Sequence, residues 1–365
     1  MIERVSFEVT SPPKYNITWK TFAIPMVGIA AFVIYIYLFN VDIQQIFGEV
    51  QKINPYYYAL AAVASLVDVF LFTLSWQFLL RHLSVKFHFL KSFAFVWIGI
   101  YVDTIIPAES VSGEIAKIYL VNKEQNGTAG KATASIVAQR LIGLGTTVVT
   151  LLVGAALLLV QSLLYGIMLT LILFLIAMVC VFFIIVVFFS FMEKWTYRML
   201  DSLIRFAEWI SRGRWKLTKL REEVLQTQKD FHVAVKEYLH APKTLFVASF
   251  FSGFSWIFAL LVYFFTFQAI GYSQISWSAI LVVSAIFVAV KAIPIGVPFE
   301  VGLPEITLTA LLQVFFGVPG LIGATATILI RLLTLWLRFF IGFGAQQWLG
   351  IKAIVSTSDR EDKSG

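Results

Sequence analysis

Long runs of apolar residues separated by short polar loops dominate the chain. Several of these runs reach the roughly 20 residues that an α-helix needs to cross the hydrocarbon core of a membrane. They predict membrane helices over residues 21–39, 57–80, 132–160, 163–189, 244–270 and 321–349. Two further stretches are interrupted near a proline, 93–106 with 111–121 and 275–293 with 301–316. The pattern therefore predicts an all-α integral membrane protein, a polytopic helical bundle.

The composition supports this class and excludes several others. Hydrophobic residues make up 59% of the chain and charged residues 13%, whereas soluble domains have about 45–50% apolar residues. A single cysteine, Cys180, and four scattered histidines leave no disulfide framework and no Cys/His metal site, so we expect no metal and no cofactor. The net charge of +7 lies mostly in loops between apolar runs, where it indicates orientation rather than a nucleic-acid partner.

The basic loops also predict the topology. The positive-inside rule assigns residues 81–91, 122–131 and 191–243, together with both termini, to the cytosol. The predicted segments are a cytosolic leader (1–20), a first membrane half (21–190, repeat core about 57–160), a cytosolic amphipathic helical insert at the membrane surface (191–243), a second membrane half (244–350, repeat core about 248–350) and a cytosolic tail (351–365). Each proline-interrupted stretch must then be a broken re-entrant hairpin in a multi-pass plasma-membrane protein.

A Pro-x-Glu-x4-Glu motif occurs once in each interrupted stretch. A shift of 191 residues places Pro107 on Pro298, Glu109 on Glu300, Glu114 on Glu305 and Arg140 on Arg331. Asp and Glu together make up only 21 of 365 residues, so the coincidence of acidic positions is informative. Because the charge rule gives the two copies opposite directions, we predict two inverted-topology repeats.

Charged residues at membrane depth predict a polar central cavity, since each costs at least about 2.5 kcal/mol at the bilayer centre. Arg140 and Arg331 are the first candidates for binding a phosphate, because a guanidinium is a planar, permanently charged fork of donors. Glu114 and Glu305 can orient the arginines, accept hydrogen bonds from a sugar or an amine, or carry protons. The candidate set also includes Glu109 and Glu300, with hairpin breaks at Pro107, Gly113, Pro298 and Gly302. Alternatively, each Glu–Arg pair is only a salt bridge that locks a hairpin to the following helix.

Five more charged residues lie in apolar surroundings: Asp68, Asp103, Lys117, Lys291 and Arg338. The two lysines and Arg338 are secondary candidates for the site. For each of the five residues, however, the sequence favours a structural role over ligand binding.

The motifs resemble those of a known family. The run Pro-Ala-Glu-Ser-Val-Ser-Gly-Glu-Ile-Ala-Lys-Ile-Tyr-Leu, followed by Ala-Ser-Ile-Val-Ala-Gln-Arg-Leu, resembles the Pro-Gly-Arg-x-Gly-Glu and Glu-Arg motifs of the lysylphosphatidylglycerol synthase transmembrane family. The later Pro-Phe-Glu-Val-Gly-Leu-Pro-Glu resembles that family's Pro-Gly-Gly-Leu-Gly-x-x-Glu. These matches place Gly113, Glu114, Arg140, Gly302, Glu305 and Arg331 on family motif positions, whereas Glu109 and Gln139 depart from the pattern.

The resemblance covers nearly the whole chain and implies a flippase-like membrane region. We therefore expect a non-enzymatic lipid transporter that moves a phosphate-bearing headgroup, of a phospholipid or a polyprenyl-phosphate-linked lipid, across the bilayer. A separate lipid-modifying enzyme is an expected partner, because no part of the chain matches a soluble aminoacyl-transferase domain. Two alternatives stay open: a membrane enzyme that uses the glutamates as acid or base on a lipid-linked substrate, and a helper subunit that transports nothing.

Overall fold

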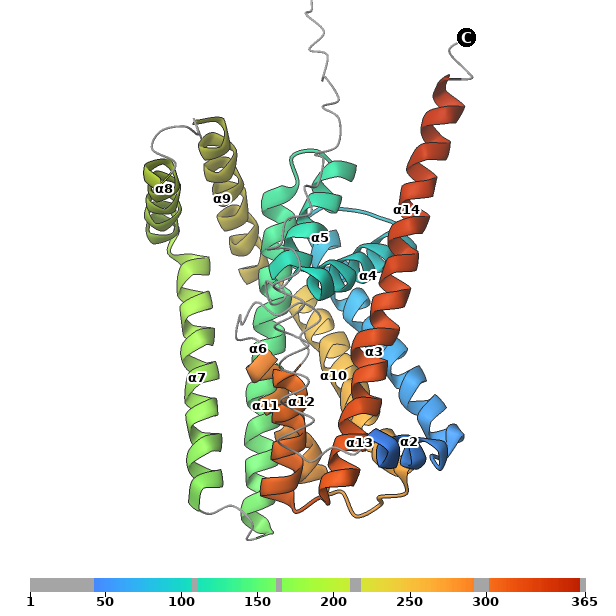
Figure 1. The fold of residues 1–365 in the computed structure, drawn as a ribbon. Helices are drawn as coiled ribbons and strands as arrows, with labels where there is room; N and C mark the ends of the chain where they lie inside the picture. The colour runs from blue at the N-terminus through green and yellow to red at the C-terminus, as the bar shows by residue number, and fades with distance from the viewer. Residues whose placement is uncertain (1–42, 107–110, 162–165, 211–217, 292–301, 362–365) are drawn as a thin grey trace, which may run out of the picture.

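The computed structural model describes residues 43–106, 111–161, 166–210, 218–291 and 302–361 (Figure 1). Every regular element in these ranges is helical. Within them, five helical segments are long and apolar enough to cross a membrane: α3 (Pro55–His82), α6 (Ala129–Val160), α7 (Gly166–Phe191), α10 (Pro242–Ile270), and the run of α13 (Gly320–Arg331), η3 (Leu332–Trp336) and α14 (Leu337–Glu361). The predicted all-α, multi-pass membrane fold is confirmed.

The remaining helices are shorter. They are α2 (Ile43–Gln51), α4 (Phe89–Ile105), α5 (Val111–Glu124), α8 (Glu193–Ile210), α9 (Thr218–Leu239), α11 (Trp277–Lys291), α12 (Leu303–Ala310) and the π-helix η2 (Leu311–Phe315). The predicted interruptions fall between α4 and α5 and between α11 and α12. The predicted helix 21–39 lies outside the described residues. The helix predicted over 321–349 is confirmed as one continuous span, Gly320–Gly350, and it contains the π-helix η3, which no sequence pattern predicted.

Helices α3 and α10 pack against each other, antiparallel, along their length. At one end the Asn54 N–H donates to the Ala269 carbonyl (2.8 Å). Toward the other end the Ser75 hydroxyl donates to the Ala248 carbonyl (2.9 Å). Helix α10 stops at Gly271, whose φ of 83° suits a glycine C-cap. The two halves of the chain therefore meet through their first long described helices.

The basic loops gather at one end of the molecule, which we name the basic end. There, Lys91 at the start of α4 forms an ion pair with Glu124 at the end of α5 (2.7 Å). The Gln228 amide on α9 donates to the Glu193 carbonyl on α8 (3.3 Å). Figure 1 shows α8 and α9 at this end and α2 at the opposite end. The described residues of the loops 81–91, 122–131 and 191–243, which the predicted topology places on one side of the membrane, therefore lie at the same end of the molecule.

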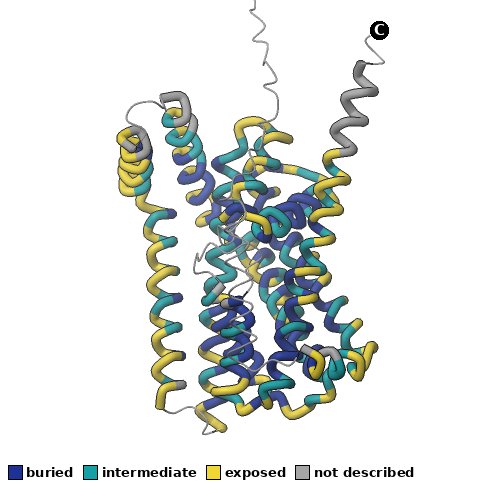
Figure 2. Tube along the Cα trace, in the orientation of Figure 1, coloured by how far each residue is buried: buried dark blue, intermediate teal, exposed yellow. Residues whose placement is uncertain are grey.

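Burial is uneven among the long helices. In the most apolar window of α7 only 11% of the residues are buried, against 56% in the α13 to α14 run. Figure 2 shows the same contrast, with α7 mainly exposed and buried residues concentrated along the central helices. In the second half, α13 and the following π-helix η3 therefore lie largely inside the bundle, whereas most residues of α7 are exposed.

Candidate functional site

The first ion pair joins Glu114, in the first turn of α5, to Arg140 on α6. The Arg140 Nη1 atom lies 2.8 Å from the Glu114 Oε2 atom. The side chains of Arg140 and Glu114 are 29% and 24% exposed. A guanidinium that is held by one carboxylate and partly exposed keeps donors that can turn to another anion.

Asp103, at the end of α4, holds the start of α5 in place. Its Oδ1 atom accepts hydrogen bonds from the Gly113 N–H (2.6 Å) and the Ser112 hydroxyl (2.8 Å). A Cβ on Gly113 would overlap the Gly99 carbonyl oxygen and the Asp103 carboxylate, so only glycine allows α4 and α5 to approach this closely. Gly113 thus lies within α5, and the chain interruption falls before Val111.

Lys117 brings a second positive charge to this region. Its Nζ atom lies 5.3 Å from the centroid of the Trp76 ring and 5.7 Å from that of Phe72, in cation–π contact with both. The side chain is buried, and Glu114 and Asp103 are its acidic electrostatic neighbours. Around the first ion pair, the described residues therefore combine two carboxylates with two cations.

The second ion pair joins Glu305 of α12 to Arg331 at the end of α13. The Arg331 Nε atom lies 2.6 Å from Glu305 Oε1, and the side chains are only 4% and 6% exposed. Glu305 Oε2 accepts the Gly302 N–H at 2.6 Å and so caps α12. Gly302 has a φ of 106°, a conformation that side-chain-bearing residues rarely adopt. Glu305 therefore fixes both the arginine and the start of its own helix.

The two arginines occupy equivalent depths, counted from opposite ends of the bundle. Arg140 follows Ala129, the first residue of α6, by 11 positions, and Arg331 follows Gly320, the first residue of α13, by the same number. At 1.5 Å per residue each lies about 17 Å along its helix. Helix α6 begins at the basic end and α13 at the opposite end (Figure 1). Both ion pairs therefore lie deep within the spanning region.

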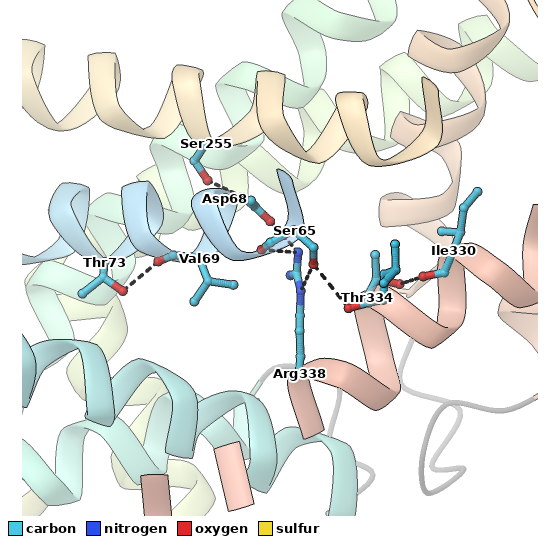
Figure 3. Close-up of polar contacts among 9 residues, drawn as sticks. Ser65, Asp68, Val69, Thr73, Ser255, Ile330, Thr334 and Arg338 are labelled. Atoms are coloured by element: carbon cyan, nitrogen blue, oxygen red, sulfur yellow. Dashed lines mark hydrogen bonds and ion pairs between the residues drawn. The ribbon is translucent and has the colours of Figure 1, made fainter. Parts of the chain in front are cut away.

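A third charged cluster connects the two halves (Figure 3). The Arg338 Nη2 atom on α14 lies 2.7 Å from the Asp68 Oδ2 atom on α3. The Ser255 hydroxyl on α10 donates to Asp68 Oδ1 (2.5 Å), and Arg338 Nε donates to the Ser65 hydroxyl (3.1 Å). The structural role favoured for both charged residues fits this satisfied network. The sequence showed the two isolated charges but gave no sign that they pair, nor that either serine takes part.

Several candidates lie outside the described residues: Pro107, Glu109, Pro298 and Glu300. Lys291 ends α11, but its side chain is also outside the described set. The structure thus brings together four of the six primary candidates as two separate Glu–Arg pairs.

Comparison with known proteins shows the family of this chain. The sequence pattern of the lysylphosphatidylglycerol synthase transmembrane region matches residues 26–342. The chain belongs to this family. A UPF0104 membrane protein from Pyrococcus horikoshii is 23% identical over 343 residues, which cover 93% of this chain and 100% of the relative. The resemblance predicted from the motifs is confirmed.

The lysylphosphatidylglycerol synthase transmembrane region, as matched here, includes both ion pairs and the Asp68–Arg338 cluster. Membership in this family is consistent with a lipid-related role in the membrane. All three pairs are therefore part of the family region and not of an appended segment.

Proposed function

We propose that this chain is a lipid transporter of the plasma membrane. It moves a phosphate-bearing headgroup, of a phospholipid or a polyprenyl-phosphate-linked lipid, along a polar route between its two halves. The proposal is carried by one observation: two equivalent Glu–Arg pairs lie at matching depths from opposite ends, one partly exposed and the other buried.

An inverted repeat is supported by the order of the helices. The shift of 191 residues that aligns Arg140 with Arg331 also relates α3 to α10, α4 to α11, α5 to α12 with η2, and α6 to the run from α13 to α14. Related helices α3 and α10 run antiparallel, as two copies with opposite orientation would. Many transporters bind their substrate at the interface between such repeats.

A re-entrant hairpin is supported by the contacts between α4 and α5. At the basic end, Lys91 contacts Glu124, and deeper in the bundle Asp103 contacts Gly113. The two helices therefore run antiparallel, and the chain returns to the end from which it came. We assign the basic end to the cytosol by the positive-inside rule.

In this mechanism, Arg140 accepts the lipid phosphate from the cytosolic side by exchanging its bond to Glu114 for bonds to the phosphate. A guanidinium suits this exchange because it stays charged in a medium of low dielectric and can donate two parallel hydrogen bonds to one phosphate. Arg331 performs the same exchange with Glu305 from the other side after the halves have rearranged. The partial exposure of the first pair and the burial of the second support a state in which Arg140 is accessible and Arg331 is closed.

The Asp68–Arg338 cluster gives this state a physical basis, since it ties α3 of the first half to α14 of the second. The shift that relates the halves places Thr147 on Arg338 and Asp68 on Ala259, so the equivalent positions carry no charge. An ion pair between the halves favours whichever arrangement allows it to form. It would have to open when the second pair becomes accessible.

A lipid-movement assay in proteoliposomes tests the proposal. The probes are fluorescent phosphatidylglycerol and a fluorescent polyprenyl phosphate, and the variants are Arg140→Ala and Arg331→Ala. Each is expected to slow movement of the transported probe about tenfold or more, because charged hydrogen bonds to the phosphate are lost. The matched control is Arg205→Ala, since Arg205 also forms an ion pair but is exposed on α8. Unchanged movement in both variants overturns the proposal.

The same preparation separates the other candidate classes. Chemical conversion of either probe, detected by mass spectrometry, would replace transport with an enzymatic activity. Motif variants that leave lipid distribution unchanged but lose a co-purifying protein would indicate a helper subunit.

A further inference from the structure

A lipid-sized space lies apart from the ion pairs. It is a groove of about 780 Å³ between α6, α7, α9 and α10. Its walls are almost entirely apolar, and α7, which forms one side, is the least buried of the long helices. Binding sites for small molecules commonly have volumes of about 300–1,000 Å³. The groove is therefore large enough for a substantial part of a lipid chain.

Several small residues on α6 and α10 contribute to the open space of the groove. Ala134, Ala138 and Gly145 line it from α6, and Ser249 and Gly253 line it from α10. A Cβ added at Gly145 or Gly253 would meet no atom within 4 Å. The neighbouring side chains thus leave this space unfilled, and an empty space in a close-packed structure forfeits the dispersion contacts of its lining atoms.

The groove is distinct from the headgroup route. With 3.6 residues per helical turn, Ala138, Gly145 and Val149 lie on the face of α6 opposite Arg140. Arg140 faces α5, whereas the groove faces α7 and α10. A lipid in the groove therefore cannot place its headgroup on the first ion pair.

One end of the groove lies near the basic end, where α7 ends (Figure 1). Ser190 and Tyr238 line the groove there, and burial raises the pKa of the Tyr238 hydroxyl, which donates to the Leu79 carbonyl (3.0 Å). The exposed residues Lys194 and Lys243 lie close in sequence to groove-lining residues at the ends of α7 and α9. The groove thus has an apolar interior, and two exposed lysines lie close in sequence to one end of it, beside the ion pair between Lys236 and Glu193.

We infer that the groove binds one hydrocarbon chain of an anionic phospholipid, with the headgroup at the basic end. The apolar walls accept the chain, and Lys194 and Lys243, which are exposed near this end, attract the negative headgroup. This inference rests on the membrane-spanning fold and goes beyond the proposed transport, because it assigns a resident lipid that is not the transported one.

Photolabelling of the full chain in lipid nanodiscs tests this site. The probe is phosphatidylglycerol with a diazirine on one acyl chain, and labelled peptides are expected from α6 and α10. Gly145→Phe and Gly253→Phe are expected to reduce this labelling about fivefold or more, since each ring fills open space without a backbone clash. The control is Gly344→Phe, because Gly344 is an exposed glycine of α14 that also has no neighbour within 4 Å.

The charge of the headgroup is tested separately. Phosphatidylcholine with the same diazirine chain is expected to label the groove about fivefold less, as is phosphatidylglycerol in Lys194→Gln with Lys243→Gln. Equal labelling by the two lipids overturns the anionic assignment.

Two outcomes overturn the site itself. One is groove labelling that neither phenylalanine variant reduces. The other is disulfide formation between cysteines placed at 253 and within 21–39, in a Cys180→Ser background, which would show that the chain's own predicted helix fills the groove. Arg140→Ala is expected to leave groove labelling unchanged, so failure of this inference and failure of the proposed transport are distinguishable.

Discussion

The two Glu–Arg pairs have the same chemistry and the same spacing, yet they differ in exposure. In each pair the arginine follows the glutamate by 26 residues. The side chains of the first pair are 29% and 24% exposed, whereas those of the second are 4% and 6% exposed. Equivalent sequence positions are therefore surrounded by different packing.

The difference arises from the helices around each arginine. Arg140 lies on α6, an unbroken helix with 28% of its most apolar window buried. Arg331 lies where α13 meets the π-helix η3, in a run with 56% of that window buried. Short π-helical segments often occur at functional sites. The comparison teaches that the two pairs differ in exposure rather than in residue type: the first pair is partly open and the second is closed.

The largest expected effect comes from breaking the closed pair. Arg331→Ala leaves the Glu305 carboxylate buried without its cation, which should lower the free energy of unfolding by about 3–5 kcal/mol. Thermal unfolding in detergent, followed by loss of the monodisperse peak in size-exclusion chromatography, measures the change.

Replacing both partners is the matched control. Glu305→Leu combined with Arg331→Leu removes the uncompensated charge and should recover most of the lost stability, except about 1 kcal/mol for the lost Gly302 hydrogen bond. Wild-type stability in Arg331→Ala alone would contradict the contrast between a closed and an open pair.

The next largest effect is expected at the cluster between the halves. Asp68→Asn keeps the shape of the side chain and an acceptor for Ser255 but removes the charge that faces Arg338. We expect a loss of about 1.5–3 kcal/mol in the same unfolding assay. Ser255→Ala, which removes only a hydroxyl, should cost less. Equal losses would mean that the ion pair between the halves adds nothing to the hydrogen bond.

A smaller effect is expected from Lys117, which helps to distinguish the surroundings of the two pairs. Lys117→Met keeps a long apolar stem beside Trp76 but removes the cation–π contact, which contributes about 2 kcal/mol when desolvated. The expected loss of stability is at most that amount, since Arg140 still neutralises Glu114. Unfolding experiments at low and high salt provide the measurement, and a gain in stability would contradict the assigned role.

Much of the fold could be predicted from the sequence, because the length of each apolar run and the position of each charged loop are local properties of the chain. The spans of α3, α6, α7 and α10 agree with the predicted runs to within a few residues at each end. The π-helices η2 and η3 could not be predicted, because they depend on how tightly neighbouring helices pack and not on a local residue pattern.

The candidate site follows from the sequence only in part. The spacing identified Glu114, Arg140, Glu305 and Arg331, since charge in an apolar run is rare and the motif is duplicated. The pairing of Asp68 with Arg338 could not be predicted, because the two residues are 270 positions apart and have no charged counterparts in the other copy. The difference in exposure between the two pairs depends on tertiary packing, which the spacing of residues along the sequence does not show.

The smallest expected change in stability is at the open pair, and it sharpens the comparison most. Arg140→Ala removes a cation whose partner is already partly exposed, so the free energy of unfolding should fall by about 1 kcal/mol or less. If Arg140→Ala destabilised the protein as strongly as Arg331→Ala, Arg140 would act as a structural lock despite its exposure. A small loss of stability together with loss of lipid movement would instead assign Arg140 to the headgroup, because a lock cannot be removed without weakening the structure it holds.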